Sequence, residues 1–160
     1  SLNVVINGPG TVNVNLPNIN YSNNFQRDYD YGTSVSLTAS TTATGYIFSG
    51  WSGACSGTGT CVVEMTDSRS VTANFVIGYS LSVEKTGNGS GTITSSPSGI
   101  DCGSTCSAGF AEGTSVTLTA SASDGSLFAG WYGEGCPETE TCVVSMTDNR
   151  LVAPIFISFY

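Results

Sequence analysis

The chain has 160 residues, a formal net charge of −8 and only 10% charged residues. Its four Lys and Arg residues are too few for the basic stripe that displaces counterions from phosphates, so we expect no nucleic-acid partner. Apolar residues make up 39% of the chain, which is enough for a packed core. Since no apolar run approaches the roughly 18 residues that a membrane span requires, we expect no membrane insertion.

The elements expected along the chain are short β-strands. In the segments 35–39 and 71–75, apolar residues alternate with Ser, Thr or Asn. This two-residue period predicts strands with one buried face and one solvated face. Glycine-rich segments such as Gly8–Gly10 and Gly87–Gly89 separate the runs and provide turns. Because no stretch of ten or more residues shows helical spacing, we predict an all-β fold.

Three sequence blocks occur twice, about 80 residues apart, which is the signature of an internal repeat. The blocks are Gly32–Ser40 and Gly113–Ser121, Phe48–Trp51 and Phe128–Trp131, and Cys61–Asp67 and Cys142–Asp148. They predict two tandem copies, over residues 1–78 and 79–160. Each copy is expected to be a small sandwich or barrel-like unit of about six short strands.

The six cysteines fall into three close pairs and none is left over. The pairs are Cys55 with Cys61, Cys102 with Cys106, and Cys136 with Cys142. In a chain this small, the pattern predicts a disulfide framework made outside the cytoplasm, hence a secreted or cell-surface location. None of the cysteine pairs has the C-x-x-C spacing that zinc sites and redox motifs use, and histidine is absent. We therefore expect no metal or cofactor.

The second copy carries several motifs in a fixed order. The segment Gly99–Cys106 is followed by Gly-Thr-Ser-Val-Thr-Leu-Thr-Ala, Phe-Ala-Gly-Trp and Cys-Val-Val-x-Met-Thr-Asp. This order resembles the divergent internalin B-repeat-like family of bacterial repeat domains, over nearly all of the second copy and most of the first. The resemblance implies a secreted or cell-surface bacterial protein, often built as a tandem array, and it implies no catalytic residues.

The first copy departs from the family pattern at one cysteine pair. Tyr21 and Phe25 stand where the second copy has Cys102 and Cys106. Closing so small a loop should contribute roughly 2 kcal/mol, and two buried aromatic rings supply a similar amount through apolar area. We therefore interpret the staple as structural and replaceable, in contrast to a catalytic or metal-binding thiol pair.

Acidic residues that could act in acid–base catalysis or bind calcium occur in one copy only. They are Asp28 and Asp30 in the first copy and Glu134, Glu138 and Glu140 in the second. Hydrolysis needs two carboxylates held across a cleft, and acids confined to loops of one copy are typical of solvated surface. We expect no enzymatic activity, with weak calcium binding by either group as the remaining alternative.

Each copy has one tryptophan that follows a Phe-x-Gly sequence, Trp51 after Phe48 and Trp131 after Phe128. One interpretation is an aromatic platform that stacks on a sugar. The other is a core tryptophan packed against its neighbouring disulfide, as in many small β domains. We favour the core role for all four aromatic residues.

The terminal strands are more apolar than the junction between the copies. The expected last strand of the first copy has the outward residues Ser70, Thr72 and Asn74, whereas the second copy has an apolar series in that strand. Val5 and Ile6 likewise stand where the second copy has Glu84 and Lys85. The apolar residues of the proposed assembly interface are Val5, Ile6, Leu151, Ala153, Ile155, Ile157 and Phe159.

Strands that are apolar on both faces are expected to be buried on both faces. Burying three or four such side chains is worth on the order of 5 kcal/mol. We therefore hypothesise head-to-tail self-association into a fibre or pilus-like filament, in which the C-terminal strand is covered by, or added to, the next subunit. Pro154 fits an edge or bulged strand there. The alternatives are ends that pack on each other or on other surface-protein domains, and a monomeric adhesin stalk or glycan- or matrix-binding module.

Overall fold

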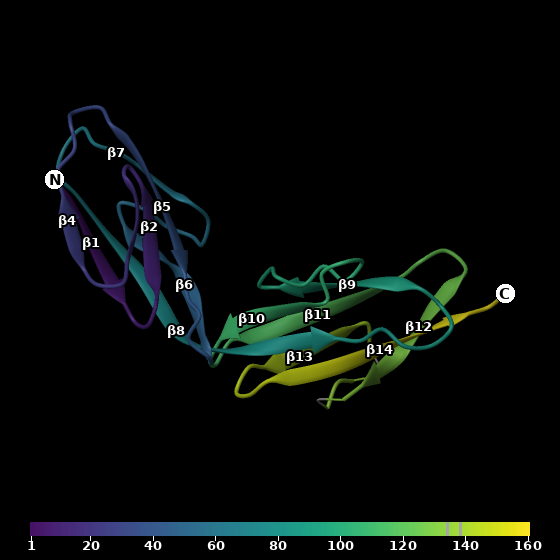
Figure 1. Ribbon diagram of the computed structural model, residues 1–160. Coiled ribbons are helices and arrows are strands. Elements are labelled where there is room, and N and C mark those ends of the chain that lie inside the picture. The colour runs from purple at the N-terminus through teal and green to yellow at the C-terminus, as the bar shows by residue number, and fades with distance from the viewer. Residues whose placement is uncertain (134, 138) are drawn as a thin grey trace. The chain divides into compact units, whose positions relative to one another are not determined.

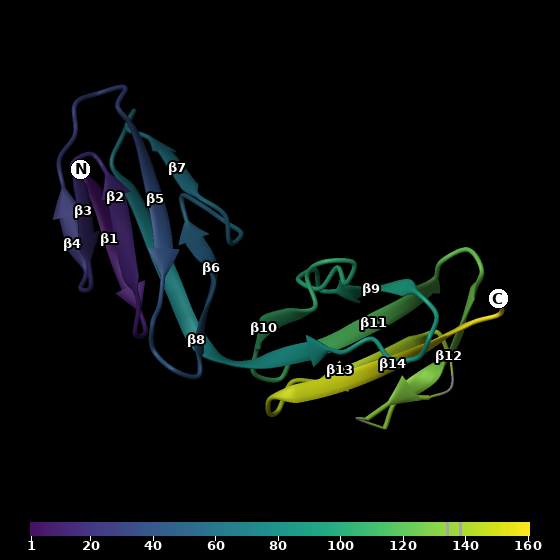
Figure 2. The same cartoon turned by 45° about the vertical axis from the view of Figure 1, so that its right-hand side comes forward.

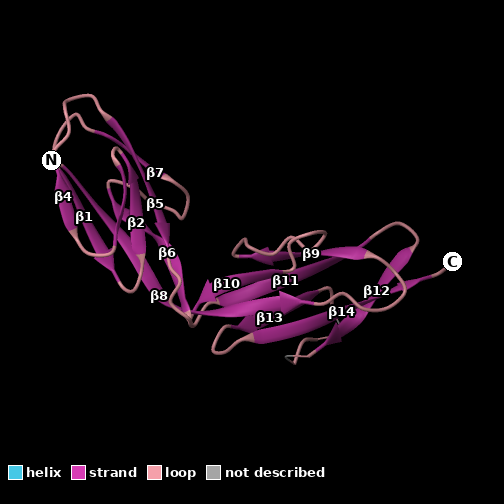
Figure 3. Ribbon diagram, in the orientation of Figure 1, coloured by secondary structure: helices cyan, strands magenta, loops and turns pink. Residues whose placement is uncertain are grey.

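The computed structural model describes every residue except 134 and 138. Its regular elements are fourteen β-strands, and the described residues contain no helix (Figure 3). Accordingly, no helix in the described part of the chain could span a bilayer. The contacts divide the chain into two compact units, Ser1–Ile77 and Gly78–Tyr160. The predicted all-β fold of two tandem repeats, each with its own local disulfides, is confirmed.

The first unit is a sandwich of two sheets. Its strands are β1 (Leu2–Asn7), β2 (Thr11–Asn15), β3 (Asn18–Tyr21), β4 (Phe25–Arg27), β5 (Ser34–Ser40), β6 (Tyr46–Gly53), β7 (Cys61–Glu64) and the first part of β8 (Arg69–Val83). One sheet has the order β4-β1-β8-β6 and the other β3-β2-β5-β7; β2, β5 and β7 lie side by side in Figure 2. The apolar residues of the alternating runs meet between the sheets, among them Val4, Leu37 and Val71.

The second unit repeats this arrangement. The rest of β8 is joined by β9 (Gly91–Ser96), β10 (Ser107–Ala111), β11 (Ser115–Ala122), β12 (Ser126–Tyr132), β13 (Thr141–Ser145) and β14 (Arg150–Ser158) (Figure 1). One sheet has the order β10-β8-β14-β12 and the other β13-β11-β9. Each unit has more strands than the six expected, because strands as short as β4 show no clear period in the sequence.

A bulge in the third-from-last strand of each unit brings Phe and Trp to the same side. Phe48 and Trp51 are three residues apart, so an unbroken strand would place them on opposite faces. The register of β6 against β8 shifts between Phe48 and Gly50, and β12 shifts likewise against β14 between Phe128 and Gly130. Gly50 has φ 139°, a conformation that glycine adopts easily. The extra residue of the bulge turns both rings into the core.

Both terminal strands are central strands of their sheets, which corrects the interpretation of Pro154. β1 lies between β4 and β8, and β14 lies between β8 and β12. Pro154 is therefore neither on an edge strand nor at the bulge, which lies in β12. Around Pro154 the ladder between β14 and the chain that follows β8 keeps its other hydrogen bonds, since Glu84 N donates to the carbonyl oxygen of Val152 and Thr86 N to that of Pro154. Pro154 interrupts that ladder by removing one N–H donor.

Candidate interaction surface

The outer side of the sheet that contains β12 and β14 is apolar. Along β14, Val152, Pro154 and Phe156 are buried in the core, so the intervening residues face outward. Cross-strand pairing sets Leu127 beside Ile157 and Tyr132 beside Ala153. We call the following residues the apolar face: Leu127, Tyr132, Leu151, Ala153, Ile155, Ile157 and Phe159.

Several members of the apolar face are strongly exposed. Leu127, Leu151 and Ile157 are 53%, 54% and 41% exposed. Tyr132 and Phe159 are 76% and 65% exposed, and Ala153 and Ile155 are half-buried. Seven side chains of these sizes and exposures amount to about 600 Å² of surface, the upper limit of the patches that ordinary monomers carry. A patch of this size and continuity is typical of an interaction site.

The matching face of the first unit is polar in the middle. Ser70, Thr72 and Asn74 occupy the places of Leu151, Ala153 and Ile155, and Ser52 occupies that of Tyr132. At the end of this sheet, Ile47 pairs with Val76 as Leu127 pairs with Ile157. The two faces therefore differ at four central positions, on strands of the same geometry.

Asn74 holds a hydrogen-bond network on the polar face. Its Nδ2 donates to the carbonyl oxygen of Gly50 at 3.1 Å and to Ser52 Oγ at 3.3 Å. Its Oδ1 accepts from Asn7 Nδ2 at 3.3 Å, and Ser49 Oγ donates to its carbonyl oxygen at 3.1 Å. Side chains that bond to one another and to water suit a solvated surface. Ile155 replaces this asparagine in the second unit and makes no polar contact of this kind.

The structure separates the two N-terminal residues assigned to the interface. Ile6 packs against the core of the first unit, because it follows the inward residues Leu2 and Val4 at two-residue spacing. Val5 faces the other side and pairs with Thr72. Of this pair, only Val5 thus lies on an outer face, and it lies among polar neighbours.

Sequence reasoning missed Leu127 and Tyr132, which extend the apolar face onto β12. Their membership follows from the register of β12 against β14, which the sequence alone does not provide. The change from Ser52 in the first copy to Tyr132 in the second was a signal that could have found one of them.

Trp51 is a core residue and Trp131 packs half-buried against the core of its unit, and both are anchored to their neighbouring disulfide loops. Trp51 is 5% exposed, and its ring contacts Phe48 edge-to-face at 5.1 Å. Trp131 contacts Phe128 in the same way at 5.2 Å. Trp51 Nε1 donates to the carbonyl oxygen of Gly59, and Trp131 Nε1 to that of Thr139, both at 2.8 Å. Each acceptor lies inside a loop closed by a disulfide, so bridge and ring stabilise one another.

All three predicted disulfides are present. They join Cys55 to Cys61, Cys102 to Cys106, and Cys136 to Cys142. In the first unit, Tyr21 and Phe25 stack with ring centroids 3.8 Å apart and an interplanar angle of 14°. In the first unit, main-chain pairing of β1 with β4 places Phe25 opposite Val4. In the second unit, Val83 takes the place of Val4, and its N–H donates to the carbonyl oxygen of Cys106, which takes the place of Phe25. An aromatic stack therefore replaces a covalent bridge at one structural position.

The acidic residues do not converge in the described part of the chain. Asp28 and Asp30 are exposed, and the described residues contain no group of three or more His, Cys, Asp and Glu side chains that could hold a metal. Of the second-copy group, Glu140 is exposed, while Glu134 and Glu138 lie outside the described residues. Calcium binding by that group stays a hypothesis.

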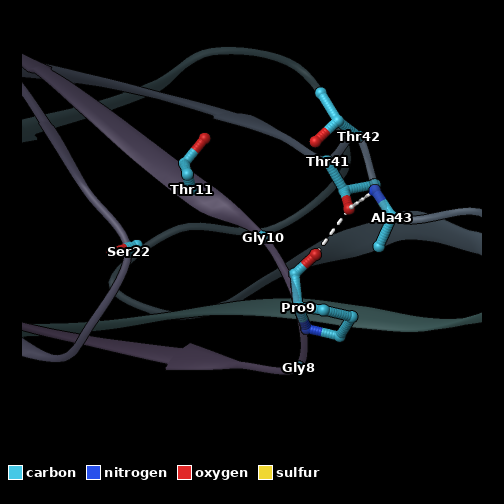
Figure 4. A pocket seen from close by; sticks show the side chains of 8 residues that line it. All are labelled: Gly8, Pro9, Gly10, Thr11, Ser22, Thr41, Thr42 and Ala43. Carbon is cyan, nitrogen blue, oxygen red and sulfur yellow. Dashed lines mark hydrogen bonds between the residues drawn. The ribbon is translucent and has the colours of Figure 1, made fainter.

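A pocket of about 380 Å³ lies in the first unit, and four of its eight lining residues carry a hydroxyl group: Thr11, Ser22, Thr41 and Thr42 (Figure 4). Thr41 Oγ1 donates to the carbonyl oxygen of Pro9 and accepts from Ala43 N, so this side chain is engaged in holding the loop.

Tyr29 lies elsewhere in the unit, with its hydroxyl donating to the carbonyl oxygen of Leu16 at 2.7 Å. Burial raises the pKa of Tyr29, with Arg27 opposing and Tyr21 adding to the shift.

Two similar all-β units with local disulfides define a tandem repeat protein. The profile of the divergent InlB B-repeat domain matches residues 7–78 and 79–156. The chain therefore belongs to this family of bacterial repeat domains, and the resemblance found in the sequence is confirmed. The family and the disulfides are consistent with a module of a surface protein in an extracellular location. No curated protein matched the chain, and no solved structure matched it.

Proposed function

We propose that this chain is a non-enzymatic structural module of a bacterial surface or secreted protein, and that copies of it associate through the apolar face. The observation that carries the proposal is the exchange of Ser70, Thr72 and Asn74 for Leu151, Ala153 and Ile155 on strands of the same geometry. The two repeats share one fold, and only the second has apolar residues at these three positions, as burial against a partner would require.

A second copy is the partner that this surface fits. None of the residues of the apolar face is charged, so the face offers nothing to a basic or acidic partner. Two such faces would bury about 1,200 Å² in total, the lower limit for stable specific interfaces. Because β14 is paired on both sides, the contact would be made by side chains and not by addition of a strand.

The alternative of a monomeric adhesin stalk or glycan-binding module loses its main support. Of the two tryptophans that would form a sugar platform, Trp51 is buried in the core and Trp131 packs half-buried against it, and the ring N–H group of each bonds to a loop carbonyl. A monomer would also leave the apolar face in water.

The test exchanges the three residues for their first-unit counterparts in L151S/A153T/I155N. Deleting part of β14 would be a poorer test, because Phe156 belongs to the core. We expect the unchanged chain to exceed the mass of one copy in light scattering and the triple variant to be monomeric with the same thermal transition. V143T, which changes an exposed valine of the other sheet, should associate like the unchanged chain.

The same measurement distinguishes the forms of association. A mass that stops at two copies indicates a symmetric pair of apolar faces, and a mass that grows with concentration indicates the head-to-tail filament expected from the sequence. If the unchanged chain and the triple variant are both monomeric, or associate equally, the proposed function is wrong.

A further inference from the structure

The first and last strands of the first unit are parallel neighbours. β1 and the first part of β8 pair in register from Leu2 with Arg69 to Asn7 with Asn74 (Figure 1). Tension along the chain enters this unit at the start of β1 and leaves it at the end of the first-unit part of β8. The two strands are therefore pulled from opposite ends.

We infer that this parallel ladder is a mechanical clamp through which each unit carries tension along the chain. Parallel strands pulled from opposite ends slide past each other, so the evenly spaced hydrogen bonds between them are loaded together. If both strands were pulled from the same end, the bonds would break one after another. Simultaneous loading raises the force at which the unit opens, and forced unfolding is governed by that barrier.

The surroundings of the ladder suit this role. β4 flanks β1 and β6 flanks β8, so neither strand of the ladder is an edge. Leu2, Val4 and Val71 are fully buried beneath the ladder. Hydrogen bonds beside a dry core are electrostatically stronger and less open to attack by water. Removing either strand would also expose the core.

The second unit contains the same clamp with one defect. β14 and β8 pair in parallel from Arg150 with Leu81 to Val152 with Val83. The carbonyl oxygen of Pro154 accepts a hydrogen bond from Thr86 N at 2.9 Å, but Pro154 has no N–H with which to donate one. The next donor along β14 is Phe156 N, which bonds to the carbonyl oxygen of Thr86 at 3.0 Å. Ala73 holds the matching place in the unbroken ladder of the first unit. The second unit should therefore open at lower force.

Pulling direction tests the clamp with its residues unchanged. Handles are attached at the N-terminus and at a cysteine introduced by I77C or by S68C, and single molecules are stretched until the first unit opens. The described native cysteines are all in disulfides, so the new thiol is unique among them. I77C loads the ladder in shear, while S68C pulls both strands from the same end. We expect the opening force for I77C to be about two-fold higher or more.

Matched substitutions test the role of the proline. In the full chain stretched from end to end, A73P should lower the opening force of the first unit by about half, and P154V should raise that of the second. Each variant is first checked for a native unfolding transition in solution. Equal forces for I77C and S68C, or a second unit whose force ignores P154V, would overturn the inference. Because isolated molecules are stretched, the result is independent of self-association.

Discussion

At the scale of single residues, one glycine in each unit leaves room for the ring of a core phenylalanine. A Cβ atom built on Gly10 would lie within the ring of Phe75, and one built on Gly91 within the ring of Phe156. Phe75 and Phe156 occupy the same place in the two copies, as do the two glycines. The requirement for glycine at these positions comes from a close approach between strand and ring.

Replacing Gly91 by alanine tests this close approach. The added methyl group would also lie 2.7 Å from the carbonyl oxygen of Ser121, so the ring and the backbone must both shift. We expect G91A to lose about 1–3 kcal/mol of unfolding free energy, the range measured for overpacked cores. G103A is the control, since a Cβ there meets nothing within 4 Å. Denaturant unfolding measures both, and an unchanged midpoint for G91A would contradict the argument.

At the scale of elements, the stack of Tyr21 on Phe25 and the Cys102–Cys106 bridge close corresponding turns of the two units. The stack joins the last residue of β3 to the first residue of β4, and the disulfide, at a sequence separation of four, closes the turn that directly precedes β10. The chain thus contains its own comparison between a covalent and a non-covalent closure of one turn.

The exchange Y21C/F25C should form a fourth disulfide in the first unit. We expect the oxidised variant to keep its stability within about 2 kcal/mol of the unchanged chain, because the entropy of the closed loop offsets the lost aromatic area. Y21A/F25A has neither closure and should lose about 2–4 kcal/mol. Mass spectrometry reports the bridge and denaturant unfolding the stability. Two free thiols in the oxidised protein would show that the positions are not equivalent.

The sequence was sufficient for the elements that follow a regular period. Alternation identified the strands around Val35 and Val71, and the duplicated blocks identified two copies of one fold. It was insufficient where the backbone departs from that period or where pairing decides the outcome. The bulge at Gly50 reverses which side Trp51 faces, and the register of β12 places Tyr132 on the apolar face. Ile6 was assigned to the outside because its first-strand register was unknown.

At the scale of the whole molecule, the two units differ in their covalent support. The first unit has one disulfide and the second has two, each closing a short loop. By the chain-entropy estimate, each bridge contributes roughly 2 kcal/mol. The stability of the second unit should therefore depend more on the redox state of the surroundings.

Reduction should lower the unfolding free energy of the second unit by about 4 kcal/mol and that of the first by about 2 kcal/mol. The chain has two tryptophans, one in each unit. W131F therefore reports the first unit by fluorescence and W51F the second, each compared with itself before and after reduction. Equal losses in the two variants would show that the bridges do not act by closing loops.

β8 has a consequence for the lifetime of such a module outside the cell. Its fifteen residues end one unit and begin the next, so Val76–Tyr79 belong to paired strand and not to a free linker. A protease needs several residues of unpaired chain in its active site, and connections between domains usually provide them. Here the connection is paired strand, so a protease could cut between the units only after one of them had opened.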